Sequence, residues 1–376
     1  DYLRAKLFTG FPWNLWAYST TWANEILQIL NLTGLYLYNL LVITFFTIPV
    51  IIFFRISTSR KLLVFSLCIL IVLSLYIYGN YEINKNRKIL NNVNQSIFVK
   101  VVSPNFDLQY GLTEREIEER FKKLIRYSDP DKNQKTLFIW PEGVFSGYSF
   151  DEVSAFKEMI KNNFSKKHTI IFGSNKLDKK TGKFFNSMIV VNNNFELIQS
   201  YEKLKLVPFG EFLPFEKALN NFGLKKITEG HGSFLKGTKN NILKIDKSNI
   251  LPLICYEIIF TDLIQNSDYD TNLIINISED GWFGKSIGPD QHFSKSIFRA
   301  IENNTFLLRS ANQGVSAIID NKGNIIKQLN RNEAGNIEFE VPLIKSNKIK
   351  NDLIFFLLLI TYVFIFSIYK EKNAKQ

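Results

Sequence analysis

Residues Leu251–Ile259, LPLICYEII, are a short apolar run that leads into a cysteine and continues as a helical pattern. A continuous apolar run of this length is typical of a strand that is buried on both faces. Cys255 therefore lies at an elbow between a strand and a helix, where its sulfur is exposed. A place near a helix N-terminus lowers the pKa of a thiol and favours the nucleophilic thiolate. The stretch predicts a reactive cysteine in a sheet-based domain; the alternative is a small core residue, the usual position of a free cysteine.

Outward from this stretch, Val-, Ile- and Phe-rich runs alternate with helical patterns. The expected strands are Ile97–Val102, Thr136–Trp140, Thr169–Gly173, Ser187–Val191, Ile250–Ile254, Leu273–Ile277 and Val315–Ile319. The expected helices are Thr113–Tyr127, Phe150–Asn162 and Pro289–Asn303. Alternation of this kind predicts an α/β fold in which helices cover a sheet.

Two other segments place charged residues beside buried strands. The run FIWPE contains Pro141, which cannot continue a strand ladder, and Glu142 follows at once. Open α/β sheets place their sites at the carboxyl ends of strands. In YEKLKLVPFGE, lysines alternate with apolar residues, so that Lys203 and Lys205 share one strand face. Taken singly, Glu142 is equally a solvated loop acid and Lys203 a surface lysine. None of the three histidines lies in these motifs, so Glu142 is the candidate base for Cys255.

Three uncharged apolar runs have the length of membrane spans, Leu35–Phe54, Leu62–Tyr78 and Leu353–Tyr369. Basic residues follow the first and the third run, namely Arg55, Arg60, Lys61, Lys370, Lys372 and Lys375. Because an excess of Lys and Arg marks the cytoplasmic side, the long middle of the chain is expected outside the cytoplasm. The aromatic-rich residues 1–22 are expected at the membrane interface.

The chain is therefore expected to have three parts. These are an N-terminal membrane region (1–79), an extracytoplasmic catalytic domain (80–350) and a C-terminal helix with a basic tail (351–376). The sequence starts at Asp1 and not at Met, and further spans are expected to precede it.

Composition excludes several other classes of function. The formal net charge is +11, but no compact Lys/Arg cluster with interleaved aromatic residues is present, so no nucleic-acid partner is expected. Cys68 lies in an apolar run and Cys255 in the middle domain, so no disulfide is expected. There is no metal-ligand cluster and no Gly-rich phosphate loop, and hence no cofactor or metal is expected.

The order and spacing of the three strand-end motifs resemble the nitrilase, or carbon-nitrogen hydrolase, superfamily. The motifs are WPE at 140–142, Y-x-K-x-x-LVPFGE at 201–211 and CYE at 255–257. Further segments look like the apolipoprotein N-acyltransferase family, namely LFTGFPW at 7–13, EDGWFG at 279–284, SIGP at 286–289, QHF at 291–293 and LLRS at 307–310. The membrane segments on both sides of the domain fit that family and do not fit soluble nitrilases.

The resemblance implies a four-layer αββα sandwich inserted between transmembrane helices. It implies Cys255 as the nucleophile, Glu142 as general base and acid, and Lys203 as the cation that stabilises the tetrahedral intermediate. Glu211 matches a further acid near the site. Tyr256 and Glu257 match positions that flank the nucleophile, with structural support as the alternative role.

The implied reaction moves an acyl chain from the sn-1 position of a phospholipid, through a cysteine thioester, to the amine of a diacylglyceryl-cysteine apolipoprotein. The implied location is the bacterial inner membrane, with a monomeric enzyme whose catalytic domain faces the periplasm. Apolar loops at Val144–Phe150 and Phe212–Phe222 are expected to form the entrance. One departure is EDGWFG, where the family usually has Asn-Asp-Ala-Trp-Phe-Gly; this affects loop packing and spares the three reacting residues.

Two rival functions stay open at this point. One is a membrane-tethered amidase or nitrilase of the same fold that uses water as the acyl acceptor. The other is a non-catalytic, membrane-anchored scaffold that binds lipoproteins, which the presence of Glu142, Lys203 and Cys255 disfavours.

Overall fold

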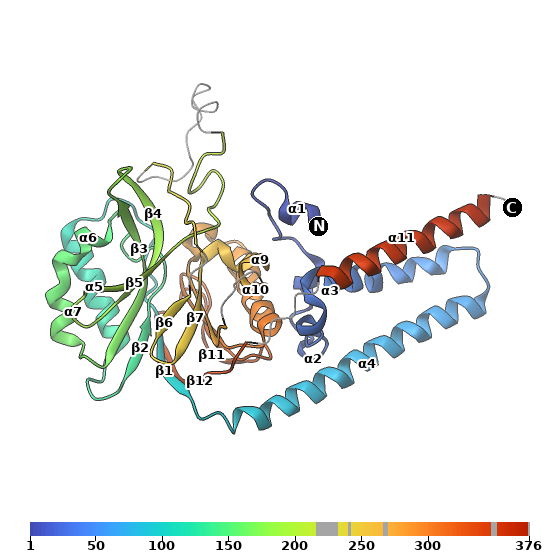
Figure 1. The fold of residues 1–376 in the computed structure, drawn as a ribbon, viewed down its shortest axis with the longest axis horizontal. Helices are drawn as coiled ribbons and strands as arrows, with labels where there is room; N and C mark the ends of the chain where they lie inside the picture. Colours follow the sequence, from blue (N-terminus) through green and yellow to red (C-terminus); the bar gives the residue numbers. More distant parts are fainter. Residues whose placement is uncertain (216–231, 240–241, 266–269, 347–351, 375–376) are drawn as a thin grey trace.

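The computed structural model describes residues 1–215, 232–239, 242–265, 270–346 and 352–374, and within these ranges it contains two six-stranded sheets (Figure 1). The first sheet has the order β12-β1-β2-β3-β4-β5 and the second has the order β11-β10-β9-β8-β7-β6. The strands of the first are β1 Ser96–Ser103, β2 Thr136–Ile139, β3 His168–Asp178, β4 Lys183–Val191, β5 Leu197–Glu202 and β12 Gly335–Pro342. Those of the second are β6 Leu243–Ile245, β7 Ser248–Ile254, β8 Leu273–Glu279, β9 Leu307–Asn312, β10 Ser316–Ile319 and β11 Ile325–Leu329.

Each sheet has a parallel centre and antiparallel edges. Strands β1, β2 and β3 are parallel, as are β7, β8 and β9, and the remaining pairs are antiparallel. In the second sheet, Ile254 of β7 pairs with Ile277 of β8, so both strands end at the same edge. The residues that follow β2, β7 and β8 consequently emerge at the carboxyl ends of parallel strands, where α/β sheets place their sites.

The strands are apolar on both faces because each sheet lies between two apolar layers. In β2, Leu137 and Ile139 pack between the sheets, whereas Phe138 packs against the outer helices. In β8, Ile275 packs between the sheets and Ile274 packs outward. Side chains alternate across a strand, so two apolar faces produce a continuous apolar run in the sequence. The predicted four-layer αββα sandwich is confirmed.

Two of the expected helices form nearly as predicted. Helix α5, Glu114–Ser128, starts after Thr113, whose hydroxyl accepts from the Glu116 backbone N–H while the Glu116 carboxylate accepts from the Thr113 N–H. Helix α10, Gly288–Asn303, has a proline in its first turn.

The helix expected at Phe150–Asn162 is interrupted. It consists of α6 Phe150–Val153, the 3-10 turn η3 Ser154–Phe156 and α7 Lys157–Asn163. The Ser154 hydroxyl donates to the Phe150 carbonyl at 2.7 Å, a local bond that competes with the helical ladder and bends helices.

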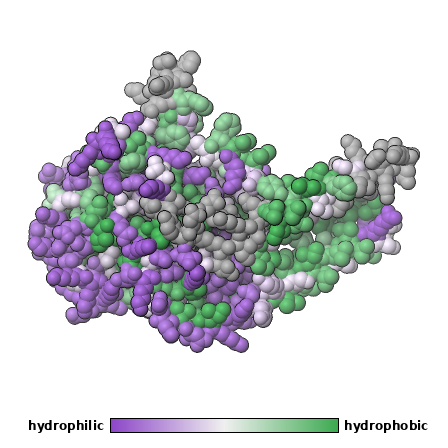
Figure 2. Space-filling model, in the orientation of Figure 1, coloured by the Kyte–Doolittle hydropathy of each residue, from purple (hydrophilic) through white to green (hydrophobic). Residues whose placement is uncertain are grey.

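The remaining helices lie near the two ends of the chain or close to the second sheet. They are α1 Tyr2–Lys6, η1 Trp16–Thr20, α2 Asn24–Leu27, α3 Leu30–Thr47, η2 Ile48–Phe53, α4 Thr58–Leu90, η4 Cys255–Ile259, α9 Asp262–Gln265, η5 Asp280–Phe283 and α11 Asp352–Ala374. Two helical segments, Leu30–Phe53 and Thr58–Leu90, are long and apolar enough to cross a membrane, and α11 carries a shorter apolar stretch at Leu353–Phe364. Helices α3, α4 and α11 project from the sandwich, and their surface is mostly hydrophobic while that of the sandwich is largely hydrophilic (Figures 1 and 2).

The far end of α4 is anchored on the sandwich. Asn86 and Asn321 exchange two amide hydrogen bonds of 2.8 and 2.7 Å, and both side chains are buried. One turn earlier, Glu82 pairs with Lys322 at 3.4 Å. Helix α4 thus carries an apolar surface along its projecting part and polar contacts to the sandwich at its far end.

Candidate active site

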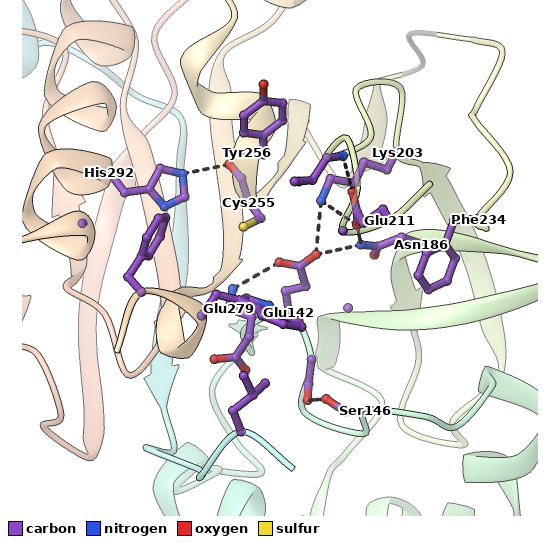
Figure 3. Close-up of a pocket in the computed structure, with 18 of the residues that line it drawn as sticks. Glu142, Ser146, Asn186, Lys203, Glu211, Phe234, Cys255, Tyr256, Glu279 and His292 are labelled. Atoms are coloured by element: carbon purple, nitrogen blue, oxygen red, sulfur yellow. Dashed lines mark hydrogen bonds and ion pairs between the residues drawn. The ribbon is translucent and has the colours of Figure 1, made fainter. Parts of the chain in front are cut away.

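A cavity of about 670 Å³ opens where the two sheets end, and it gathers the residues singled out in the sequence. Glu142 follows β2, Lys203 follows β5 and Cys255 follows β7, and all three line the cavity together with Glu211 (Figure 3). Most of the remaining wall is aromatic or apolar, including Phe11, Trp13, Leu108, Tyr110, Phe145, Val207, Phe234 and Phe283. The structure therefore places these four charged or nucleophilic groups in a largely apolar chamber.

The carboxylate of Glu142 is held by three donors. Its Oε1 accepts from the Asn186 side-chain amide at 2.7 Å and lies 3.5 Å from the Lys203 Nζ. Its Oε2 accepts from the backbone N–H of Glu279 at 3.1 Å. Gly173 of β3 packs so closely that an added Cβ would lie 2.7 Å from the Glu142 Cα. Glu142 is therefore a buried, oriented carboxylate and not a solvated loop acid.

Lys203 is almost completely buried, with an exposed fraction of 1%. Its Nζ donates to Glu211 at 2.9 Å and lies 3.5 Å from Glu142. Burial by itself lowers the pKa of this ammonium, but the carboxylates of Glu142 and Glu211 more than offset it, and the net pKa is raised above its ordinary value. Lys203 thus carries a fixed positive charge at the cavity wall.

The expectation that Lys205 shares a strand face with Lys203 is wrong. Strand β5 ends at Glu202, so both lysines lie in the segment after it. Lys205 is only partly buried and pairs with Asp262 at 3.3 Å, away from the Glu142–Lys203 pair. Pro208 and Gly210 do lie in the turn that follows, and both line the cavity.

Asn186 of β4 joins the carboxylates of Glu142 and Glu211, and it was not predicted from the sequence. Its side-chain nitrogen donates to Glu142 at 2.7 Å and to Glu211 at 2.6 Å. Glu211 in turn accepts the backbone N–H of Val207 at 2.8 Å. The only signal in the sequence was a polar residue directly before the expected strand Ser187–Val191, and this is weak in an asparagine-rich chain.

Comparison with known proteins concerns the whole chain. The sequence profile of the carbon-nitrogen hydrolase family matches residues 108–350, and that of the apolipoprotein N-acyltransferase N-terminal domain matches residues 1–48. The apolipoprotein N-acyltransferase of Rickettsia typhi is 32% identical over 91% of this chain and 68% of its own length. That of Rickettsia prowazekii is 31% identical over 98% of this chain and 73% of its own length.

The chain belongs to the apolipoprotein N-acyltransferase family. The relative from Rhodopseudomonas palustris is 29% identical over 91% of this chain and 66% of its own length. The chain spans about two thirds of the length of these relatives. Among solved structures, a nitrilase-superfamily protein of Saccharomyces cerevisiae superposes with a TM-score of 0.48 at 18% identity, over 66% of this chain and 91% of that one.

The pKa of the Cys255 thiol differs from the value expected from the sequence. Only a single 3-10 turn, η4 Cys255–Ile259, follows the strand, and it is too short to act as a helix dipole. Burial raises the pKa of the thiol well above its ordinary value; the negative charge of Glu142 adds to this rise, and the ammonium of Lys203 opposes it. The predicted lowering of the pKa is therefore wrong.

Glu257 connects the cysteine elbow to the lysine segment. Its Oε1 accepts from the backbone N–H groups of Leu204 and Lys205 at 2.7 and 3.0 Å and from the Tyr201 hydroxyl at 3.0 Å. Its Oε2 accepts from the backbone N–H of Ile254 at 2.8 Å. One buried carboxylate thus fixes the residues next to Lys203 against the residue before Cys255. This geometry supports a structural role for Glu257, the alternative left open by the sequence.

Replacing Glu257 with glutamine is expected to lower the free energy of unfolding by about 1–3 kcal/mol, because the new NH2 group faces a backbone or hydroxyl donor. Burial raises the pKa of Glu257 from 4.5 to about 7, so the carboxyl takes up a proton on folding between these values. Its contribution to stability consequently falls as the pH rises through about 7. Thermal unfolding in detergent at pH 5 and 8 should show that the glutamine variant has lost this part of the pH dependence.

The control for this variant is Glu202→Gln, since Glu202 pairs with Lys176 at 2.9 Å in a partly exposed position. It should change the unfolding temperature little at either pH. An equal pH dependence in the wild-type chain and Glu257→Gln would contradict the role given to the buried carboxyl.

Tyr256 ties the site to the N-terminal segment. Its hydroxyl donates to the Gly10 carbonyl at 3.0 Å, and its ring stacks with Phe11 at 6.2 Å between centroids. Trp13 donates from its indole N–H to Gln291 of α10 at 2.9 Å. The aromatic N-terminal segment, expected only at a membrane interface, therefore forms part of the cavity wall.

The two loops expected at the entrance have different outcomes. Phe145, Ser146 and Gly147 of the first loop line the cavity. Of the second loop, residues 216–222 lie outside the described residues. Within the described part of the chain, no group of His, Cys, Asp and Glu side chains has the arrangement of a metal site.

Proposed function

We propose that this chain is a membrane-anchored acyltransferase that moves an acyl chain from the sn-1 position of a phospholipid to the α-amine of a diacylglyceryl-cysteine apolipoprotein. The observation that carries the proposal is the presence of Glu142, Lys203 and Cys255 in one apolar cavity of about 670 Å³. Apolar walls suit acyl chains, and the few polar groups converge on one point, as expected of a site that orients a reacting carbonyl. Family membership supports the same reaction.

In the first half-reaction, Glu142 accepts the thiol proton of Cys255 and the sulfur attacks the ester carbonyl of the phospholipid. Cys255 and Glu142 lie close to each other on the wall of the same cavity (Figure 3). Negative charge develops on the carbonyl oxygen, where the Lys203 ammonium stabilises it. The C–O bond then breaks, Glu142 returns the proton to the leaving oxygen, and a lysophospholipid departs. A thioester remains on Cys255.

In the second half-reaction, the α-amine of the acceptor attacks the thioester. Glu142 accepts a proton from the amine, the C–S bond breaks, and the proton passes to the sulfur to restore the thiol. The product is an amide on the acceptor. A covalent intermediate divides one difficult transfer between two lipids into two easier steps, and one base serves both of them.

The proposal includes a membrane arrangement. Residues 1–79 form an N-terminal membrane region, 80–350 the catalytic domain, and 351–376 a C-terminal helix with a basic tail. The basic residues between the first two spans and after the last one support a cytoplasmic location of those ends; in this arrangement the catalytic domain of a monomer faces the periplasm of a bacterial inner membrane.

The test is intact-protein mass spectrometry of the chain after incubation with phospholipid in detergent. A mass gain of one acyl chain that hydroxylamine removes is the expected result. A synthetic diacylglyceryl-cysteine lipopeptide should then discharge the thioester and become N-acylated. Discharge at the same rate without lipopeptide would identify water as the acceptor and overturn the transferase proposal, and the absence of any mass gain would overturn the thioester.

A further inference from the structure

A buried network of charged side chains lies behind the cysteine elbow, and it has no part in the mechanism proposed above. Arg309 of β9 pairs with Asp280 at 2.7 Å, and Asp280 lies 2.9 Å from the Nδ1 of His292 on α10. All three side chains have exposed fractions of 0–1%. Ser278 also donates to Asp280 at 2.7 Å, and Gly314 approaches so closely that an added Cβ would lie 2.1 Å from its Oδ2. The aspartate, and with it the imidazole, is therefore held from several sides.

This network reaches the backbone of Cys255 through His292. The Nε2 of His292 lies 3.2 Å from the carbonyl oxygen of Cys255 (Figure 3). A carbonyl oxygen only accepts hydrogen bonds, so Nε2 carries a proton and donates. The Nδ1 of His292 lies near an acceptor, the Asp280 carboxylate, and near a donor, the Arg309 guanidinium at 3.1 Å. A protonated Nδ1 can donate to Asp280, and an unprotonated Nδ1 can accept from Arg309.

The Cys255 backbone needs such support. Its φ of +48° lies in the left-handed region, which costs a non-glycine residue free energy and persists only where neighbours enforce it. Glu257 holds the N–H of Ile254 on one side of the elbow, and His292 holds the carbonyl of Cys255 on the other. Trp13 stacks on the imidazole at 5.4 Å between centroids and covers it.

We propose that His292 is a positioning residue: its hydrogen bond to the Cys255 carbonyl keeps the elbow in its left-handed conformation and so aims the sulfur at the reacting carbonyl. Asp280 and Arg309 orient the ring, and Trp13 keeps water from the bond. This inference deepens the proposed function and rests on it. It concerns the backbone of the nucleophile, whereas Glu142 and Lys203 act on the reacting atoms.

The experiment compares two neutral amides at position 292. His292→Gln places an amide N–H near the position of Nε2 and keeps the donor, whereas His292→Asn reaches only to the position of Nδ1 and loses it. The control is His168→Asn, because His168 is also buried and its Nε2 lies 2.8 Å from a carbonyl, that of Asp131, far from the cavity. His292→Phe keeps a ring against Trp13 without a donor, and it replaces His292→Asn if the latter does not fold.

The readouts are kcat and KM for thioester formation, the alkylation rate of Cys255 by iodoacetamide without lipid, and the unfolding temperature. We expect His292→Asn to lower kcat about 100-fold with little change in KM, as a displacement of about 1 Å does. His292→Gln should recover most of this loss, and His168→Asn should react like the wild type. Equal losses in the two position-292 variants, or an equal loss in His168→Asn, would overturn the inference.

Alkylation separates this inference from the proposed function. One possible outcome is that the wild type forms no thioester while Cys255 is alkylated at different rates in His292→Asn and His292→Gln. This outcome would overturn the proposed function and leave the positioning role in place. Unchanged alkylation and acylation in His292→Asn would overturn the positioning role and leave the proposed function in place.

Discussion

Replacing Cys255 with alanine is expected to abolish acyl-enzyme formation, lowering the transfer rate by roughly six orders of magnitude, to the background level. The reason is chemical: the thioester forms on the sulfur, and the charged groups proposed to act with it, Glu142 and Lys203, are a carboxylate and a charged ammonium. A charged ammonium is not nucleophilic, and the pKa of Lys203 is raised. The measurement is the hydroxylamine-labile mass gain together with the rate of lipopeptide acylation.

Cys68→Ala is the matched control. Cys68 is the other cysteine of the chain and belongs to the apolar part of α4, whereas Cys255 lines the cavity. It should acquire acyl chain and transfer it like the wild type. Residual labile acylation in Cys255→Ala, or its loss in Cys68→Ala, would contradict the assignment of the nucleophile.

Lys203→Met is expected to reduce kcat for thioester formation by about 10²–10³-fold, because removal of one donor to a developing oxyanion typically costs about 3–4 kcal/mol. The substitution also leaves Glu142 and Glu211 without the cation between them, while Asn186 still joins the two carboxylates. Kinetics of thioester formation by the wild type and by Lys203→Met test this expectation.

Lys205→Met provides the comparison, since it removes the same functional group two positions along the chain. Lys205 is partly exposed, and its ion pair with Asp262 at 3.3 Å is of a kind that contributes about 1 kcal/mol or less. We expect its kcat to stay within about threefold of the wild-type value. Similar losses in both variants would mean that Lys203 acts through general folding and not through the oxyanion.

Much of the fold was predictable from the sequence, because strand and helix patterns are local. The runs around Phe138 and Ile275 alternate between two apolar layers, so their continuous apolar character indicated buried strands. The Thr113–Glu116 capping pair and Pro289 mark helix starts that depend on near neighbours only. The interruption of the helix at Phe150–Asn162 was not predicted; it falls at Ser154, whose hydroxyl donates to the Phe150 carbonyl.

The candidate site, like the fold, was predictable from the sequence only in part. The sequence by itself determined the motifs that carry Glu142, Lys203 and Cys255, and the family to which they belong. Only the tertiary structure decided that Asn186 joins two carboxylates, that His292 bonds to the Cys255 carbonyl and that Trp13 covers the imidazole. It also reversed the expected direction of the thiol pKa. The physical reason is that residue identity and periodicity are encoded locally, whereas desolvation and hydrogen bonding depend on which distant segments bury one another when the sheets close.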